Sequence, residues 1–243
     1  MPLNNLRMPA LLSAAGMLFA SASAATVVDQ GAIALVSLSN QSSIKWSVMN
    51  DPVMGGQSHS ALKMTSSYGS FSGTCAIVPF LKAPGFCKIA TDTGFFHPHT
   101  FPDASQFIAG SLYIEIRSTM SAYKGYKVAF SAKNITRPRP GMHHAGPSFK
   151  ADFSALVPPS TMSGEDWSTV KIPFSSFSVD WSEFTGECDT KDPTGEQHFC
   201  CTTEHPEVCP KDYHLRQLTG FEIWAEGIEG QFAIDVRSIS AGP

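Results

Sequence analysis

Alternation of apolar and polar residues with a period of two dominates this chain of 243 residues. The pattern is clearest at residues 112–117, 149–153 and 232–237. Successive side chains of a strand point to opposite faces, so each segment predicts a half-buried strand. Similar short segments occur at 33–39, 44–49, 59–65, 70–78, 86–91, 126–132, 167–172 and 218–225. Many short strands without a long amphipathic helix predict an all-β sandwich or jelly roll.

Two irregular stretches interrupt the strand pattern, at residues 134–148 and about 180–214. The second stretch contains four cysteines. Strand-like sequence resumes after each stretch, so both are predicted to be surface loops of one domain.

The first 24 residues have the three parts of a secretory signal peptide. Arg7 is a positive residue, residues 10–20 are mostly apolar, and Ala22 and Ala24 form a small-residue cleavage site. We expect cleavage after Ala24, which leaves residues 25–243 as one exported domain in an extracellular or lumenal compartment. No later stretch is long and apolar enough to predict a membrane span.

The number and distribution of charged side chains limit the kinds of molecule that this chain is expected to bind. The chain has 17 basic and 21 acidic side chains, and the basic residues form no block. Nucleic acids and anionic membranes attract clustered positive charge, so neither is the expected main partner.

Six cysteines in an exported chain predict disulfides. Cys75 and Cys87 flank the predicted turn PFLKAPG, so we expect a bridge between them across neighbouring strands. Adjacent cysteines rarely pair with each other because the ring is strained. Cys200 and Cys201 should therefore bond separately to Cys188 and Cys209, and the sequence leaves both arrangements open.

Zinc is the alternative for these later cysteines. Three histidines lie nearby, at His198, His205 and His214. The chain lacks the C-x-x-C spacing of many zinc sites, and an oxidising compartment favours disulfides, so no metal is expected there.

The stretch NDPVMGGQS, residues 50–58, could be a phosphate loop, a catalytic turn or a bend. The residues after Gly56 alternate like a strand, whereas a phosphate loop precedes a helix. A nucleophile elbow needs G-x-S-x-G, which the chain lacks. Gly55 and Gly56 permit unusual backbone angles and Asn50 and Asp51 can bond local amides, so we interpret the stretch as a bend.

This bend belongs to a longer signature. Residues 46–60 resemble the opening motif of the complex I intermediate-associated protein 30 family, and further segments follow in the family's order up to residue 239. The motif residues are Trp46, Asn50, Asp51, Met54, Gly55, Gly56 and Ser58. The resemblance implies a galactose-binding-like jelly-roll β-sandwich without a shared catalytic apparatus. The leader lacks the Arg-rich character of a mitochondrial presequence, so a mitochondrial location is not expected.

Other residues with reactive or metal-binding side chains form no catalytic set. The histidines at 97, 99, 143 and 144 lie in Pro-rich loops, where we expect solvated side chains. Asp180 with Glu183, or Glu187 with Asp189, could be glycosidase carboxylates, but spacing in a loop cannot fix the separation that this chemistry requires. We expect no catalytic residue and no cofactor.

The aromatic residues and sequons give weaker signals. Trp46, Trp167 and Trp224 fall in strand patterns and are predicted to be core residues. Two loop aromatics, Trp181 and Tyr213, could stack on a sugar. The sequons begin at Asn40 and Asn134, which are possible glycosylation sites in an exported chain.

Two functions remain. The family resemblance implies a non-enzymatic protein-binding or assembly module, exported through the secretory pathway. The alternative is a secreted carbohydrate-binding module, which rests on fold-level analogy. That alternative would gain support from two or three exposed aromatic residues on one face.

Overall fold

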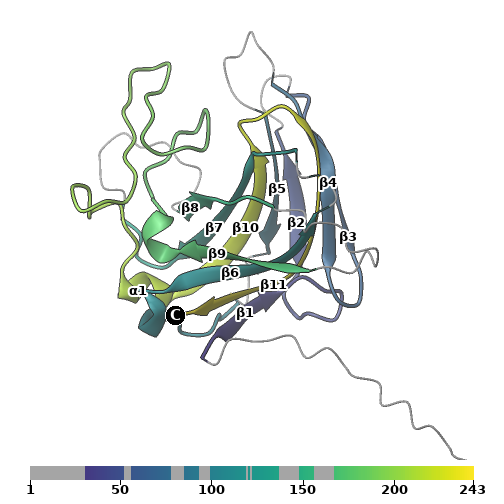
Figure 1. The fold of residues 1–243 in the computed structure, drawn as a ribbon, viewed down its shortest axis with the longest axis horizontal. Helices are drawn as coiled ribbons and strands as arrows, with labels where there is room; N and C mark the ends of the chain where they lie inside the picture. The colour runs from purple at the N-terminus through teal and green to yellow at the C-terminus, as the bar shows by residue number, and fades with distance from the viewer. Residues whose placement is uncertain are drawn as a thin grey trace, which may run out of the picture.

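The computed structural model describes residues 31–51, 56–77, 85–92, 99–118, 120, 122–136, 148–155 and 167–243. Two antiparallel sheets pack face to face in this part of the chain (Figure 1). The expected all-β jelly-roll sandwich is confirmed. The expected signal peptide and its cleavage site lie outside the described residues.

The larger sheet has six strands. Five follow the order β3-β4-β11-β6-β9, and β1 pairs with β11 beside them. Their bounds are β1 Ile33–Ser37, β3 His59–Met64, β4 Gly69–Cys75, β6 Ser111–Ser118, β9 Ser168–Pro173 and β11 Gly230–Gly242.

The smaller sheet has five strands in the order β2-β5-β10-β7-β8. Their bounds are β2 Trp46–Asn50, β5 Phe86–Thr91, β7 Tyr126–Ala132, β8 Ser148–Asp152 and β10 Leu218–Glu226. Every strand segment expected from the alternating pattern is therefore present. The helical elements among the described residues are short: η2 Ser105–Phe107, η3 Phe174–Ser176 and α1 Asp212–Leu215.

The core lies between the sheets and is rich in aromatic side chains. The Phe71 and Phe232 ring centroids are 4.8 Å apart within the six-stranded sheet, and those of Phe130 and Phe149 are 5.2 Å apart within the five-stranded sheet. All four residues are almost fully buried. Burying each such side chain contributes roughly 1.5–3 kcal/mol, which explains why the alternating pattern is enough to specify two sheets.

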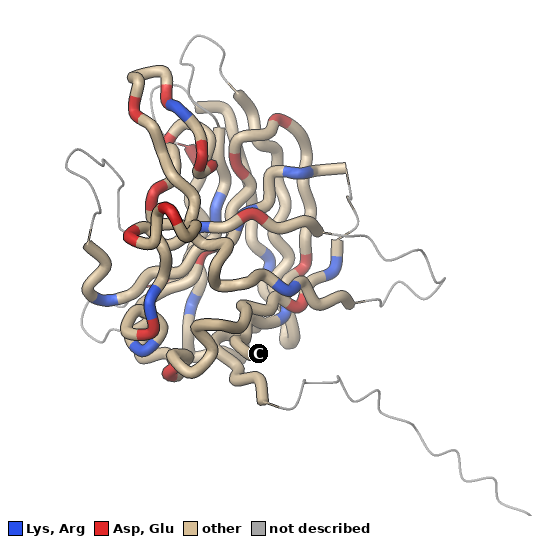
Figure 2. Tube along the Cα trace, turned by 60° about the vertical axis from the view of Figure 1, so that its left-hand side comes forward, with Lys and Arg blue, Asp and Glu red and all other residues tan. Residues whose placement is uncertain are grey.

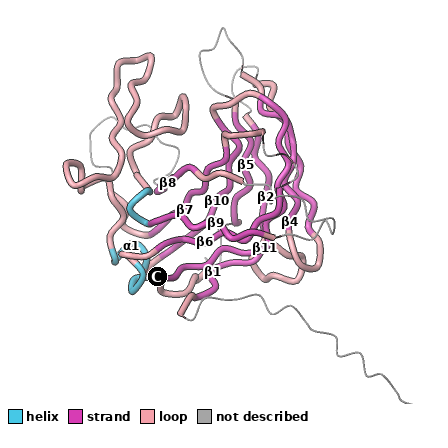
Figure 3. The backbone as a smooth tube through the Cα atoms, viewed as in Figure 1, coloured by secondary structure: helices cyan, strands magenta, loops and turns pink. Residues whose placement is uncertain are grey.

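The outer faces of the two sheets differ. The irregular segment before α1 runs beside β8 (Figure 3). Its residues Trp181 and Glu187 contact outward-facing side chains of β10 and β7, so it covers part of the outer face of the five-stranded sheet. Its first contacts are backbone hydrogen bonds between Ser178 and Lys150, and a bond from the Trp181 indole N–H to the Ser148 carbonyl oxygen at 3.0 Å. Within the described residues, no helix is long and apolar enough to cross a membrane.

Candidate functional site

The described residues of the family motif mainly hold the backbone together at one end of the sandwich. Ser60 donates from its hydroxyl to the Asn50 side-chain oxygen at 2.5 Å. The Ser58 hydroxyl donates to the Ala76 carbonyl and accepts from the Ala76 N–H, at 3.2 and 3.0 Å. These bonds join β2, β3 and β4 across the end of the sandwich.

Gly56 permits a close approach in this motif. A Cβ atom at Gly56 would lie 2.4 Å from the Asp51 carboxyl carbon and 2.5 Å from the Asp51 carbonyl oxygen. Side chains do not approach this closely, so the position excludes any residue with a Cβ unless the backbone shifts. Met54 and Gly55 lie outside the described residues.

The expected disulfide between Cys75 and Cys87 is wrong. Both residues are free thiols and are completely buried. The sequence suggested a hairpin, but Cys75 ends β4 of the six-stranded sheet and Cys87 belongs to β5 of the five-stranded sheet. The two strands therefore belong to different sheets rather than to one hairpin, although they approach each other here: the Cys87 thiol lies 3.7 Å from the Thr74 carbonyl oxygen. Burial raises the pKa of the Cys87 thiol to about 11, which keeps it protonated and unreactive.

The prediction for the later cysteines is confirmed. Cys188 bonds Cys200, and Cys201 bonds Cys209. The structure thus selects one of the two arrangements that the sequence left open. With all four sulfurs in disulfides, these cysteines are not ligands for zinc.

A buried ionic cluster organises the same segment. His198 contacts Asp180 through Nδ1 at 2.8 Å and Asp192 through Nε2 at 2.9 Å, and all three side chains are almost fully buried. Burial opposes a charge on the ring, but the hydrogen bonds to Asp192 and Asp180 outweigh it and raise the pKa of His198. Protonated His198 can donate from both ring nitrogens, so it bridges the two carboxylates.

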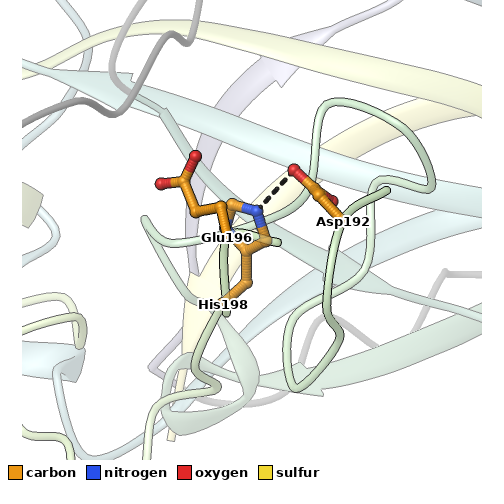
Figure 4. A group of neighbouring side chains, drawn as sticks. All are labelled: Asp192, Glu196 and His198. Atoms are coloured by element: carbon orange, nitrogen blue, oxygen red, sulfur yellow. Dashed lines mark hydrogen bonds and ion pairs between the residues drawn. The ribbon is translucent and has the colours of Figure 1, made fainter. Parts of the chain in front are cut away.

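The same cluster includes the residues best placed to hold a metal. One ligand atom from each of Asp192, Glu196 and His198 lies within 4.8 Å of the others, and Figure 4 shows His198 directing a ring nitrogen at Asp192. That nitrogen is already engaged by the Asp192 carboxylate, and Ser182 donates to the other oxygen of Asp192. We interpret the cluster as a structural ion network.

The acidic pairs considered as glycosidase residues have structural contacts instead. Asp180 is fully buried and accepts from the Phe199 N–H as well as from His198. Glu187 pairs with Lys127 of β7. Of the histidines near the later cysteines in the sequence, His205 contacts the Cys209 sulfur through its carbonyl oxygen, and His214 packs on Phe149. Of the loop histidines, 97, 143 and 144 lie outside the described residues.

Trp181 is not available for stacking on a sugar. It is only 7% exposed and packs against Trp224, with ring centroids 6.2 Å apart. The Lys150 ammonium lies between the two indoles, 3.6 Å from the Trp181 centroid and 3.8 Å from that of Trp224. Tyr213 is 46% exposed and packs at a tilt against His214, so it remains accessible as a single aromatic.

The outer face of the five-stranded sheet, called the covered face below, has its charges paired. Lys150 bonds Glu226 at 2.7 Å, and both side chains are buried. Burial lowers the pKa of Lys150, and Glu226 partly offsets this effect. Lys88 bonds Glu222 at 2.8 Å, and Lys127 pairs with Asp152 as well as Glu187. Together with the loop that crosses it, this pairing leaves the covered face little capacity for a ligand.

The outer face of the six-stranded sheet, called the open face below, carries a cluster of aromatic and arginine side chains. The Arg237 guanidinium carbon lies 4.0 Å from the Trp167 ring centroid. The Arg117 guanidinium lies about equally far from Trp167 and Tyr68, at 5.0 and 5.1 Å. The Tyr68 and Trp167 rings meet edge to face at 5.6 Å. These four residues form the aromatic–arginine cluster.

Two carboxylates hold the arginines of this cluster in place. Asp235 accepts from Nε and Nη2 of Arg117 at 3.0 and 2.7 Å, and Glu115 pairs with Arg237. The side chains of Arg117 and Arg237 remain 22% and 32% exposed. The cluster is therefore ordered in advance and still reaches solvent.

The sequence interpretation missed this cluster because it assigned Trp167 to the core. Trp167 instead lies on the open face, immediately before β9. Trp224 is buried as expected, but beneath the covering loop rather than between the sheets, and Trp46 packs partly against the core. A signal was present: Arg117 and Asp235 alternate with core residues, which places them on the outer face of their strands.

Two further features complete the candidate sites. The sequon residues Asn40 and Asn134 are both exposed, at turns that follow β1 and β7.

An open groove of about 490 Å³ lies between the edge strands β8 and β9. Its lining includes Lys124, Asp152 and Lys171 but no histidine or cysteine, so it offers no activated nucleophile.

Comparisons with known structures identify similar sandwiches. A family 11 carbohydrate-binding module from Clostridium thermocellum, in complex with a β-1,3-1,4-mixed-linked tetrasaccharide, is 15% identical, with a TM-score of 0.48 over 87% of this chain and 95% of that one. The agarase AgWH50C is 10% identical, also with a TM-score of 0.48, over 88% of this chain and 25% of that one. These similarities are too low to transfer a ligand or an activity. A comparison with curated protein sequences finds no match.

A comparison with protein-family models gives a clear result. Residues 36–194 match the family described as complex I intermediate-associated protein 30 (CIA30). The match includes β2, the motif at residues 46–58 and most of both sheets. Because it covers well over half of the 243 residues, the chain belongs to the complex I intermediate-associated protein 30 family.

Proposed function

We propose that this protein is a non-enzymatic protein-binding module and that the open face is its contact surface. The aromatic–arginine cluster is the observation that carries the proposal. Trp, Tyr and Arg are the residues most enriched at the energetic centres of protein interfaces. On the open face, two aromatic residues and two arginines lie together and are partly exposed.

Preorganisation supports this function. Glu115 and Asp235 already fix the arginines. Binding a partner would therefore cost these arginines less side-chain entropy than it would cost mobile side chains. Ser70 and Ser72 of β4 border the cluster, and their short side chains do not project above it. The covered face lacks these properties because its own loop fills it.

A carbohydrate-binding function is less well supported by the same cluster. Sugar rings stack on an accessible aromatic face, but Arg237 lies over one face of the Trp167 ring. Trp181, the other aromatic considered for stacking, is buried. Export through the secretory pathway remains part of the proposal, and it rests on the leader sequence alone.

Affinity capture with matched variants tests this function. The mature protein, Trp167→Ala and the control Tyr213→Ala would each be incubated with native extract and with a panel of polysaccharides. We expect proteins that are retained by the parent and by Tyr213→Ala but lost from Trp167→Ala, provided that all three melt alike. Polysaccharide binding that depends on Trp167, without such proteins, would contradict the proposal and favour the carbohydrate-binding alternative.

A further inference from the structure

The open face has an excess of positive charge. Its strands carry four basic and two acidic residues, namely Lys63, Arg117, Lys171, Arg237, Glu115 and Asp235. Both acidic side chains are less than one-fifth exposed, and each is bound to an arginine. Lys63 and Lys171 are exposed on β3 and β9, on either side of the aromatic–arginine cluster.

This excess contrasts with the rest of the molecule. The chain as a whole has a net charge of −4. On the covered face, Lys88, Lys127 and Lys150 each pair with an acidic side chain. Figure 2 shows several acidic residues along the irregular segment before α1. Positive charge is therefore concentrated on the face that is open to solvent.

We infer that the open face binds an acidic segment of a partner protein; this inference rests on the proposed function and names the partner's chemistry. Carboxylates approaching the face would meet the exposed Lys63 and Lys171 first. Neither lysine is paired with an acidic side chain in the described residues, although the Lys171 ammonium donates to the Pro243 backbone oxygen at 3.2 Å. Asp235 and Glu115 hold the arginines in place, and Trp167 and Tyr68 supply apolar contact area beside them. Charge of one sign on one face also steers association of an oppositely charged partner.

Salt dependence follows from this arrangement. The Debye length falls from roughly 30 Å at 0.01 M ionic strength to about 8 Å at physiological ionic strength. Attraction between an acidic segment and the exposed lysines should therefore weaken as salt is added. The contribution of Trp167 should change much less, because contact between apolar surfaces is not screened.

The test uses a fluorescent glutamate-rich peptide, a glutamine-rich peptide of equal length and a sulfated polysaccharide as probes. The protein variants are Lys63→Glu/Lys171→Glu and the control Lys133→Glu/Lys191→Glu, which reverses two exposed lysines away from the open face. We expect the parent and the control to bind the glutamate peptide similarly. The open-face variant should bind at least about tenfold more weakly, and its remaining binding should depend less on salt.

Four outcomes would overturn the inference. The glutamine peptide could bind as well as the glutamate peptide, both double variants could weaken binding equally, or the polysaccharide alone could bind. A native partner that is lost from Trp167→Ala but binds Lys63→Glu/Lys171→Glu as it binds the parent would also overturn it. That last result would leave the proposed protein-binding function intact, so the two failures can be told apart.

Discussion

Arg237 stacks on Trp167, with its guanidinium carbon 4.0 Å from the ring centroid. Arg237 belongs to β11 and Trp167 directly precedes β9, and these two strands flank β6. The contact joins β11 to the residue that precedes β9. It places an arginine and an aromatic ring together at the surface, on the sheet face that none of the described loops covers. The binding function proposed for this protein depends on that contact.

The buried pair Lys150–Glu226 predicts a large effect of removing one partner. Lys150→Met leaves the Glu226 carboxylate buried without its cation, so we expect a loss of about 3–5 kcal/mol in the free energy of unfolding. The double variant Lys150→Met/Glu226→Leu should lose much less. Urea denaturation measures both.

Lys88 provides the control for this experiment. Its pair with Glu222 is less buried, so Lys88→Met should cost only about 1 kcal/mol or less. Equal losses in the free energy of unfolding for Lys150→Met and Lys88→Met would show that burial of the Lys150–Glu226 pair does not increase the cost of removing its lysine.

His198 predicts a pH dependence of stability. Its pKa is raised in the folded protein, so its contribution is fully present below the unfolded value of about 6.5 and is lost as pH rises through the folded value. The parent should therefore be more stable than His198→Gln at about pH 6, and the difference should shrink towards about pH 9. Denaturation of both proteins across this range is the measurement.

Comparing the parent with His198→Gln also cancels the contributions of other titrating groups to the pH dependence. Burial lowers the pKa of His214, which gives a pH dependence of opposite sign, but parent and variant share it. A stability difference that grows with pH would mean that His198 is neutral in the folded protein.

Gly56 predicts strain on substitution. Gly56→Ala would bring its Cβ atom within 2.5 Å of the Asp51 carbonyl oxygen, and relief requires a backbone shift at the end of β2. We expect a loss of about 1–3 kcal/mol, measured by thermal melting. Gly220→Ala is the comparison, since its closest contact would be the Thr91 hydroxyl at 3.2 Å, and it should cost less.

The cysteines predict a definite peptide map. Digestion without reduction should yield the pairs Cys188–Cys200 and Cys201–Cys209. Cys75 and Cys87 should react with an alkylating reagent only after unfolding, because both thiols are fully buried. A peptide that links Cys75 to Cys87, or alkylation of the native protein, would disagree with the structure.

Much of the fold could be predicted from the sequence because the alternating pattern records which face of each strand meets the core. Arg117 and Asp235 follow that pattern, and both point outward as it requires. The pattern does not say which strands are neighbours. Cys75 and Cys87 are close in sequence, but chain proximity suggested a hairpin where the chain in fact passes from one sheet to the other.

The candidate site was harder to predict for a related reason. Trp167 precedes its strand, and only the pairing of β9 with β6 brings it to the arginines of β6 and β11. The burial of Trp181 depends on the path of a loop across β7 and β10, which local sequence does not specify. The pairing of the adjacent cysteines succeeded because ring strain is a local constraint.

Lysine protection in a native complex tests the central claim most directly. The protein would be acetylated under mild conditions, alone and bound to the partner recovered by affinity capture, and each lysine would be quantified by mass spectrometry. Binding through the open face predicts strong protection of Lys63 and Lys171 and little change at Lys133 and Lys191, all four of which are exposed in the free protein. Protection of Lys133 or Lys191 with Lys63 and Lys171 unchanged would contradict the assignment of the open face as the contact surface.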